Sequence, residues 1–245
     1  MKIKLICFIA LMFGCGNASD AASDHCIKVG QDLVSAFHDF NGDAGQQGWF
    51  HDDYSCAVLT GENLQGIQLY GPYNPMAPVC ESMNNNSGLL ISCRTNLTGA
   101  QMAGINLSVA DLSRAVLNNA NLRNALLFRA LIIDTQFIGA DLTGADMRIT
   151  NSAGAGYYRA IMIRANLSNS VLSRARLTEA NLTEANLTEA DLTDAVLNNA
   201  NLNRANLQNA NLTGANLTGA TFLGTNLRGA ILDRVLGANF TGAIR

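Results

Sequence analysis

Four cysteine residues, Cys26, Cys56, Cys80 and Cys93, are the side chains of this 245-residue sequence whose number and spacing most clearly indicate chemistry. An even number of cysteines in a short stretch of an exported protein is typical of disulfide bonds. We expect two bonds, and we favour Cys26–Cys56 with Cys80–Cys93 because each closes a local segment. Four unpaired core thiols are the alternative. A zinc site is disfavoured because the spacings contain no C-x-x-C pair.

The start of the chain indicates an export signal. A basic N-terminus precedes the apolar run Leu5–Phe13, whose nine residues are too few to span a bilayer and match a signal-peptide core. Two cleavage modes are open. Phe13–Gly16 resembles a bacterial lipobox that would make Cys15 the lipidated N-terminus, whereas ordinary signal peptidase would cut near Ala18 or Ala21. We therefore expect an exported protein, either periplasmic or an outer-membrane lipoprotein, that meets the membrane only through a lipid anchor.

Histidine and serine side chains provide the remaining candidates for chemistry. All three histidines lie near aspartates in the N-terminal region: His25, His38, Asp39, His51, Asp52 and Asp53. Histidines in a small polar segment are more often solvated than metal-bound, so we expect no metal site. Ser152 would need a nearby base to act as a nucleophile, yet no His, Cys or Lys follows Arg94. We expect no catalytic residue, no cofactor and no enzymatic activity.

The element that organises the rest of the chain is a five-residue repeat from Thr95 to Arg234, seen most clearly in Ala180–Glu184. Stepping by five from Leu97 to Leu232 gives 28 central positions, of which 20 are Leu and seven are Met, Ile, Phe or Tyr. Two residues before each centre, 22 of the 28 positions are Ala. With a period of five, the Leu residues would not stay on one side of a helix or on one face of a flat strand. The pattern therefore predicts a solenoid with Leu inside and Ala at the close approaches of the backbone.

Charged residues at the end of each repeat indicate the size of one coil. At a spacing of 20 residues, five pairs attract and none repels: Arg114/Asp134, Arg159/Glu179, Arg164/Glu184, Arg174/Asp194 and Glu184/Arg204. At a spacing of 15 residues, three pairs attract and three repel. Neighbouring coils with opposite charges are slightly favoured, so twenty residues per coil is preferred to fifteen. Twenty-five is not excluded by this comparison.

The A-(D/N)-L-x-x phrase resembles the pentapeptide-repeat proteins, and the resemblance covers about 140 residues of the chain. It implies an all-β fold, a right-handed quadrilateral β-helix with four pentapeptides per coil and about seven coils. Family members include DNA-mimicking gyrase protectors of the quinolone-resistance type. The resemblance implies no shared catalytic residues.

These patterns predict that the chain is divided into three segments. We expect a signal peptide over residues 1–18 and a small disulfide-bonded N-terminal cap over residues 19–94. The cap contains an imperfect start of the repeat, with Leu59, Leu64 and Leu69 five residues apart, and a proline-rich insertion. The pentapeptide-repeat β-helix then covers residues 95–245. A cap of this kind would cover the open edge of the first coil.

Charge is distributed unevenly between the cap and the rod. Residues 20–93 contain nine acidic residues and one Lys, whereas residues 94–245 contain ten acidic residues and 13 Arg. A near-neutral rod lacks the clustered basic face that nucleic acid requires, and it also lacks the acidity of a DNA mimic. We therefore expect a rigid structural or protein-interaction module of the bacterial envelope with an unknown protein partner and no bound nucleic acid. A gyrase-protecting DNA mimic is the alternative, and the oligomeric state is left open.

Large apolar side chains occupy several positions that the repeat directs outwards. They are Leu126, Phe128, Leu131, Ile133, Ile138, Tyr158, Ile161 and Ile163. Exposed apolar groups that gather on a soluble protein are typical of a docking site. We expect Ile138 and Tyr158, one coil apart, to stack. The alternative is that the cap or the proline-rich loop folds over these residues.

Two short stretches depart from the repeat. Ser152 replaces an apolar residue at a central position, and Gly154 and Gly156 follow it, which predicts a local bulge. Near the C-terminus the phase breaks after Arg234, and Phe240 is expected to plug the last coil.

Overall fold

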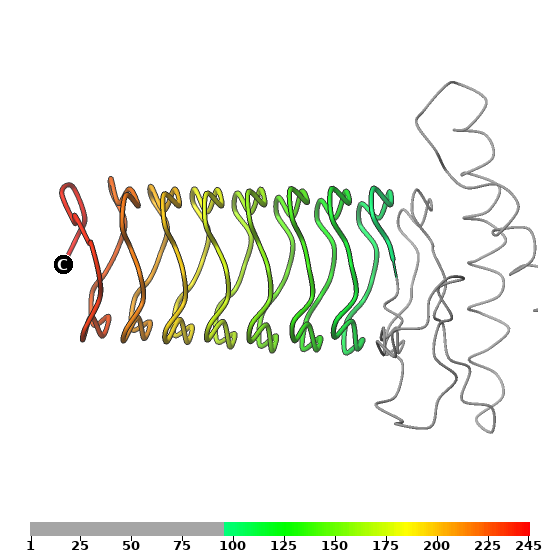
Figure 1. Ribbon diagram of the computed structural model, residues 1–245, viewed down its shortest axis with the longest axis horizontal. Coiled ribbons are helices and arrows are strands. Elements are labelled where there is room, and N and C mark those ends of the chain that lie inside the picture. Colours follow the sequence, from blue (N-terminus) through cyan, green and yellow to red (C-terminus); the bar gives the residue numbers. More distant parts are fainter. Residues whose placement is uncertain (1–95) are drawn as a thin grey trace, which may run out of the picture.

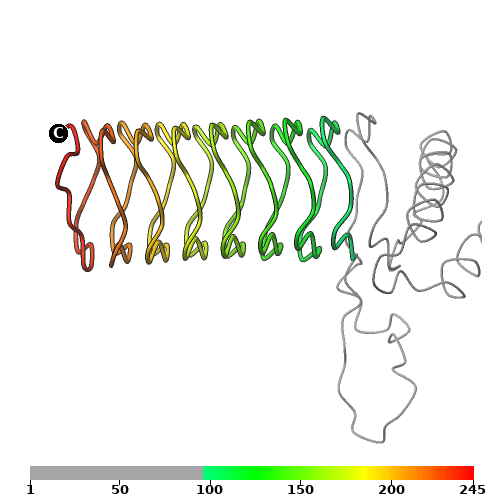
Figure 2. The same cartoon turned by 90° about the horizontal axis from the view of Figure 1, so that it is seen from above.

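Residues 96–245 are described by the computed structural model, and they wind into a rod of stacked coils (Figure 1, Figure 2). Parallel backbone bridges join residues that are twenty apart, from Asn96–Val116 near one end to Asn216–Leu236 near the other. One coil therefore takes twenty residues, as the charge pairs predict. Because the chain turns after every five residues, each coil has four sides.

The pairing between coils uses single residues. Within residues 96–245 the backbone forms neither a helix nor a strand longer than one bridge residue. The reason is geometric, because a turn follows each bridge residue before a longer ladder can form. The rod is thus a β-helical solenoid whose sheets consist of columns of isolated bridges.

The N-terminal predictions fall on residues that the structure does not describe. The signal peptide of residues 1–18 and the cap of residues 19–94 lie outside the described residues, together with Cys15, Cys26, Cys56, Cys80, Cys93 and the three histidines. The repeat-like leucines of the cap lie there too, so the total of about seven coils stays a prediction.

The repeat Ala180–Glu184 shows how every backbone N–H group is used. The Asn181 N–H donates to the preceding coil, and the Leu182 and Glu184 N–H groups donate to the following coil, at 2.8–3.0 Å. The Thr183 N–H donates to the Asn181 side chain at 3.1 Å. The N–H of the next alanine, Ala185, donates to the Leu182 carbonyl at 3.0 Å and closes the turn. No donor of the repeat is left without a partner, as a buried backbone requires.

We number the five positions of each repeat from this example, so that Ala180 is position 1 and Glu184 is position 5. Position 5 has a positive φ in all 28 repeats, with 59° at Glu184. This is the third residue of the turn that Leu182 and Ala185 close, and a positive φ there is the pattern of a type II turn. Glycine or asparagine is favoured at such a site, which explains why both recur at position 5.

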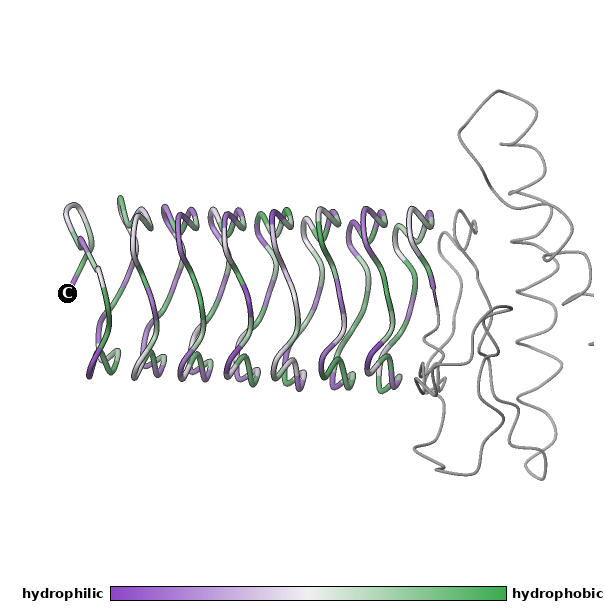
Figure 3. Ribbon diagram, in the orientation of Figure 1, coloured by the Kyte–Doolittle hydropathy of each residue, from purple (hydrophilic) through white to green (hydrophobic). Residues whose placement is uncertain are grey.

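The core is a column of side chains along the rod axis. Positions 1 and 3 are buried from Leu97 to Leu227, whereas positions 2, 4 and 5 face outwards. Figure 3 shows the resulting alternation of apolar and polar residues along each coil. The sequence prediction of inward Leu and Ala is therefore confirmed for these residues.

The predicted bulge at Ser152 is wrong. Bridges continue in register through Asn151–Val171 and Gly156–Arg176. Ser152 is fully buried and lies beside the hydroxyl of Tyr157, the core residue of the next repeat. A tyrosine needs more room than a leucine, so the small serine leaves space for it and no bulge is needed.

The tyrosine continues an aromatic stack within the core. Its ring lies parallel to that of Phe137 in the preceding coil, with the centroids 5.1 Å apart. Burial raises the pKa of Tyr157, whose hydroxyl has no hydrogen-bond partner of good geometry.

The C-terminal end is closed by aromatic packing, as expected. Phe240 contacts Phe222 with the ring centroids 5.0 Å apart, and the Arg245 guanidinium lies 4.6 Å from the Phe240 centroid. The phase break appears in the register, because Asn226 pairs with Ile244 only eighteen residues later.

Candidate interaction surfaces

All eight apolar residues predicted for an interaction site occupy outward positions 2 or 4. Four are exposed (Leu126, Leu131, Ile138 and Ile161), and four are half-buried (Phe128, Ile133, Tyr158 and Ile163). The structure does not bring them into one patch. Successive repeats lie on successive sides of the coil, so residues that are near in sequence are distributed around the perimeter of the rod.

Ile138 and Tyr158 are brought together, as the twenty-residue spacing predicts. Both occupy position 4 on the same side of successive coils, and we call residues related in this way a column. The neighbouring Gly139 N–H donates to the Tyr158 carbonyl at 2.9 Å. Ile161, three residues after Tyr158, lies on the following side of the same coil and is 38% exposed. We call Ile138, Tyr158 and Ile161 the Tyr158 surface.

Charged neighbours hold Tyr158 in place. The Arg159 guanidinium lies 4.8 Å from the centroid of the Tyr158 ring. Arg159 Nε also donates to Glu179 Oε2 at 2.7 Å, and the Tyr158 hydroxyl donates to Glu179 Oε1 at 3.4 Å. The hydrogen bond to Glu179 is the main cause that raises the pKa of Arg159. These contacts favour one orientation of the ring, which lowers the entropy that a binding partner would have to remove.

A second apolar group follows one corner of the rod, and sequence reasoning found only two of its four residues, Phe128 and Leu131. Val109 and Ile149 occupy position 5 of one column, two coils apart, and are 53% and 50% exposed. Arg129 lies between them in that column. Phe128 comes directly before Arg129, and Leu131 lies on the adjoining side of the coil. We call the four apolar residues the Val109 corner. The missed signal was a β-branched residue at a position that is otherwise glycine, asparagine or charged.

The backbone makes the two β-branched residues unusual. Val109 has a φ of 61° and Ile149 a φ of 57°. A β-branched side chain in the left-handed region is strained, at a cost of about 1–2 kcal/mol per residue. The turn alone would therefore be better served by glycine or asparagine. Arg148 partly covers the corner, because its guanidinium lies 5.4 Å from the centroid of the Phe128 ring.

Three of the five predicted charge pairs form between coils. Arg159 contacts Glu179 and Arg164 contacts Glu184, both at 2.7 Å, and Arg204 approaches Glu184 from the other side at 3.5 Å. The hydrogen bond from Arg164 is the main cause that lowers the pKa of Glu184. These pairs are exposed, so each adds little to the free energy of unfolding.

Two predicted pairs do not form within residues 96–245: Arg114 with Asp134, and Arg174 with Asp194. The direction of the aspartate side chain explains this. The Asp134 carboxylate lies against Gly154 of the next coil, in the space that a Cβ would occupy, and Asp194 lies in the same way against Gly214. Each aspartate therefore points to the following coil, whereas its arginine lies in the preceding coil of the same column.

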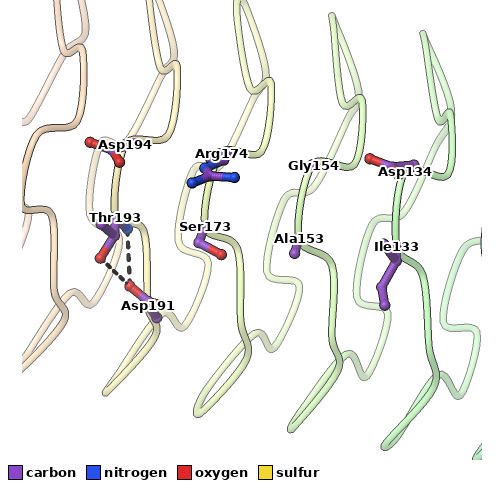
Figure 4. Close-up of a pocket in the computed structure, with 9 residues that line it drawn as sticks. All are labelled: Ile133, Asp134, Ala153, Gly154, Ser173, Arg174, Asp191, Thr193 and Asp194. Atoms are coloured by element: carbon purple, nitrogen blue, oxygen red, sulfur yellow. Dashed lines mark hydrogen bonds between the residues drawn. The ribbon is translucent and has the colours of Figure 1, made fainter.

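A shallow depression crosses four coils on one side of the rod (Figure 4). There Ile133 is followed in the next two coils by the smaller Ala153 and Ser173. Its lining residues are Ile133, Asp134, Ala153, Gly154, Ser173, Arg174, Asp191, Thr193 and Asp194. The Thr193 N–H and hydroxyl both donate to Asp191 Oδ1, as the dashed lines in Figure 4 show. The Asp191 oxygen is thus engaged by its own repeat, and the depression has no arrangement of nucleophile and base.

The described part of the chain offers no cluster for a metal ion. Within residues 96–245, no three His, Cys, Asp or Glu side chains are close enough to ligate one. In the same range no helix is long and apolar enough to cross a membrane.

The family model for pentapeptide repeats matches the chain in eight copies, over residues 94–127, 110–148, 160–199 and 195–234. None of the curated proteins compared with the chain matches it.

Solved structures similar to the chain include HetL, a pentapeptide repeat protein involved in heterocyst differentiation regulation from the cyanobacterium Nostoc sp. strain PCC 7120. That likeness has 27% identity over 82% of this chain and 90% of HetL, with a TM-score of 0.48. QnrB1, a plasmid-mediated fluoroquinolone resistance protein, is similar at 20% identity over 71% of each chain, with a TM-score of 0.37. A pentapeptide repeat protein of the Arabidopsis thaliana thylakoid lumen shares 31% identity over 48% of this chain and 65% of its own length, with a TM-score of 0.19.

Proposed function

Because the chain belongs to the pentapeptide-repeat family, we propose that it is a non-enzymatic, rigid protein-interaction module that is exported to the bacterial envelope. The apolar run Leu5–Phe13 behind a basic N-terminus supports export. The absence of His, Cys and Lys after Arg94 in the sequence supports a role without catalysis.

The observation that carries this proposal is the Tyr158 surface. Tyrosine and arginine are among the residue types that most often dominate the energy of protein interfaces, and Tyr158 and Arg159 are adjacent here. Ile138 and Ile161 flank the ring with apolar area, each worth roughly 1.5–3 kcal/mol when fully buried by a partner. A rigid rod loses little conformational freedom on binding, so a small surface of this kind is sufficient for a specific contact.

The alternative, a gyrase-protecting DNA mimic, is not supported by the charge of the rod. A mimic of DNA needs rows of unpaired acidic groups at its surface. Here Glu179 and Glu184 contact arginines of neighbouring coils, and arginines outnumber acidic residues from residue 94 onwards.

The proposal is tested by covalent capture in intact cells. A photo-crosslinking amino acid replaces Tyr158 in one strain and Thr218, three coils along the same column, in a control strain. Irradiation is expected to give a discrete adduct with an envelope protein from position 158 and none from position 218. The additional change Ile138→Asn should remove the adduct while the melting temperature stays the same. Adducts at both positions or at neither would contradict the proposal.

A further inference from the structure

The Val109 corner is an apolar surface confined to the N-terminal part of the rod. Its column carries Val109, Arg129 and Ile149 in three successive coils and then changes to polar residues, beginning with Asn169. At position 4 of the same corner Phe128 is the one apolar residue, between Ser108 and Arg148, and polar residues follow in the later coils. The apolar character therefore ends a few coils from the point where the chain enters the rod.

Backbone geometry indicates that the fold does not require the apolar side chains of Val109 and Ile149. Val109 and Ile149 are the two β-branched residues with a positive φ in residues 96–245, and the same column uses Asn169 and Asn209 for the same turn. Asparagine adopts this conformation with less strain. The turn does not require valine or isoleucine, so contact with another surface explains them better than the turn does.

Charge indicates what covers the corner. Arg129 lies between Val109 and Ile149 in the column, and Arg114 ends the adjoining side of the first described coil. Neither forms an ion pair within residues 96–245. The segment that precedes the rod, residues 20–93, has a net charge of −8. The two parts of the chain are therefore complementary in charge.

The preceding segment also has the right residue types and reach. Its run Trp49–Tyr54 combines three aromatic side chains with two aspartates, which suits an apolar surface that carries arginine. It is joined to the first described coil, and Ile149 lies two coils beyond Val109, a distance of only about 10 Å at strand spacing. The covalent link also raises the effective concentration of the segment at this surface.

We propose that the acidic segment of residues 20–93 packs against the Val109 corner of its own rod. This contact buries the strained side chains of Val109 and Ile149 and neutralises Arg129 and Arg114. It leaves the Tyr158 surface, on other sides of the coil, free for an external partner.

Hydrogen–deuterium exchange of the full chain tests this contact. The double variant Val109→Asn with Ile149→Asn introduces the residue that the column already uses at Asn169, so the turns should be kept. We expect the slowest backbone amides of residues 20–93 to exchange about tenfold faster or more, while the amides of the rod exchange no faster than before. The matched control Ile161→Asn makes the same change on another side, where the column already uses Asn181, and should leave residues 20–93 unaffected.

A charge reversal provides a second, independent variant. Arg129→Glu should also speed exchange in residues 20–93, and added salt should have the same effect on the unaltered protein. Unchanged exchange of residues 20–93 in both variants would overturn the proposal. Sedimentation equilibrium distinguishes the main competitor: a dimer that the double variant converts to monomer, with exchange in residues 20–93 unchanged, would assign the corner to a second copy and would also overturn it.

Discussion

Asn181 accepts two hydrogen bonds from Thr183, one from the backbone N–H at 3.1 Å and one from the hydroxyl at 2.6 Å. The same arrangement recurs in most repeats where Asn or Asp at position 2 is followed by Thr at position 4, as in Asp191 with Thr193. It satisfies the one backbone donor of the repeat that pairs neither with a backbone carbonyl of a neighbouring coil nor with the turn. This relationship explains why the repeat prefers A-(D/N)-L-T.

Removing this acceptor should destabilise the rod. In the variant Asn181→Ala the Thr183 N–H loses its partner, and we expect the free energy of unfolding to fall by roughly 0.5–1.5 kcal/mol. Urea unfolding measures the change. Thr178→Ala is the control, because Arg176 at position 2 of that repeat provides no acceptor, and it should change the stability by less than about 0.5 kcal/mol. Equal effects of the two variants would show that the side-chain bond contributes nothing.

The core column provides a larger effect. Leu187 is fully buried in the middle of the rod. Its replacement by alanine leaves a cavity between coils that the backbone bridges prevent from collapsing. We expect a loss of roughly 2–5 kcal/mol in unfolding free energy. A change no larger than that of the outward control Thr178→Ala would contradict the placement of Leu187 inside the rod.

Ser152 and Tyr157 should depend on each other. Ser152→Leu restores the residue that most repeats carry at position 3, yet it fills the space beside the Tyr157 hydroxyl. We expect this variant to be less stable by about 1–3 kcal/mol because the core is overpacked. The double variant Ser152→Leu with Tyr157→Leu should recover most of the loss. If Ser152→Leu alone stabilises the protein in thermal unfolding, the two residues do not compensate in volume.

The mass of the mature protein tests the N-terminal predictions. We expect a chain that begins after residue 18 or residue 21, or at a lipidated Cys15, with Cys26, Cys56, Cys80 and Cys93 protected from alkylation in two disulfides. Mass spectrometry of envelope fractions under non-reducing conditions gives both results. An uncleaved N-terminus or four alkylated cysteines would contradict export and the disulfides respectively.

The five-residue period made the solenoid and its buried column predictable, because every repeat makes the same demand on the backbone. The twenty-residue coil was predicted from the charge pairs and from the family resemblance. The family match adds the right-handed winding of the solenoid. The interaction site was harder to predict. Leu126 and Ile138 are near each other in the sequence, but each repeat turns the chain onto another side of the coil. Val109 and Ile149 were missed because the positive φ of position 5, which makes a β-branched residue there unusual, became evident only in the structure. The pairs of Arg114 and Arg174 did not form because each aspartate points to the following coil, away from the arginine in the preceding coil.

Both surfaces depend on twenty residues forming each coil along the whole rod, so a distance along one column is the most direct test. Thr98 and Thr218 occupy position 4 of the same column, six coils apart by this register. Spin labels attached there through a noncanonical amino acid should give a narrow distance distribution near 29 Å, taking about 4.8 Å per coil. Fifteen residues per coil would place the labels eight coils and about 38 Å apart. A distance near the larger value, or a broad distribution, would contradict the register that creates the Tyr158 surface and the Val109 corner.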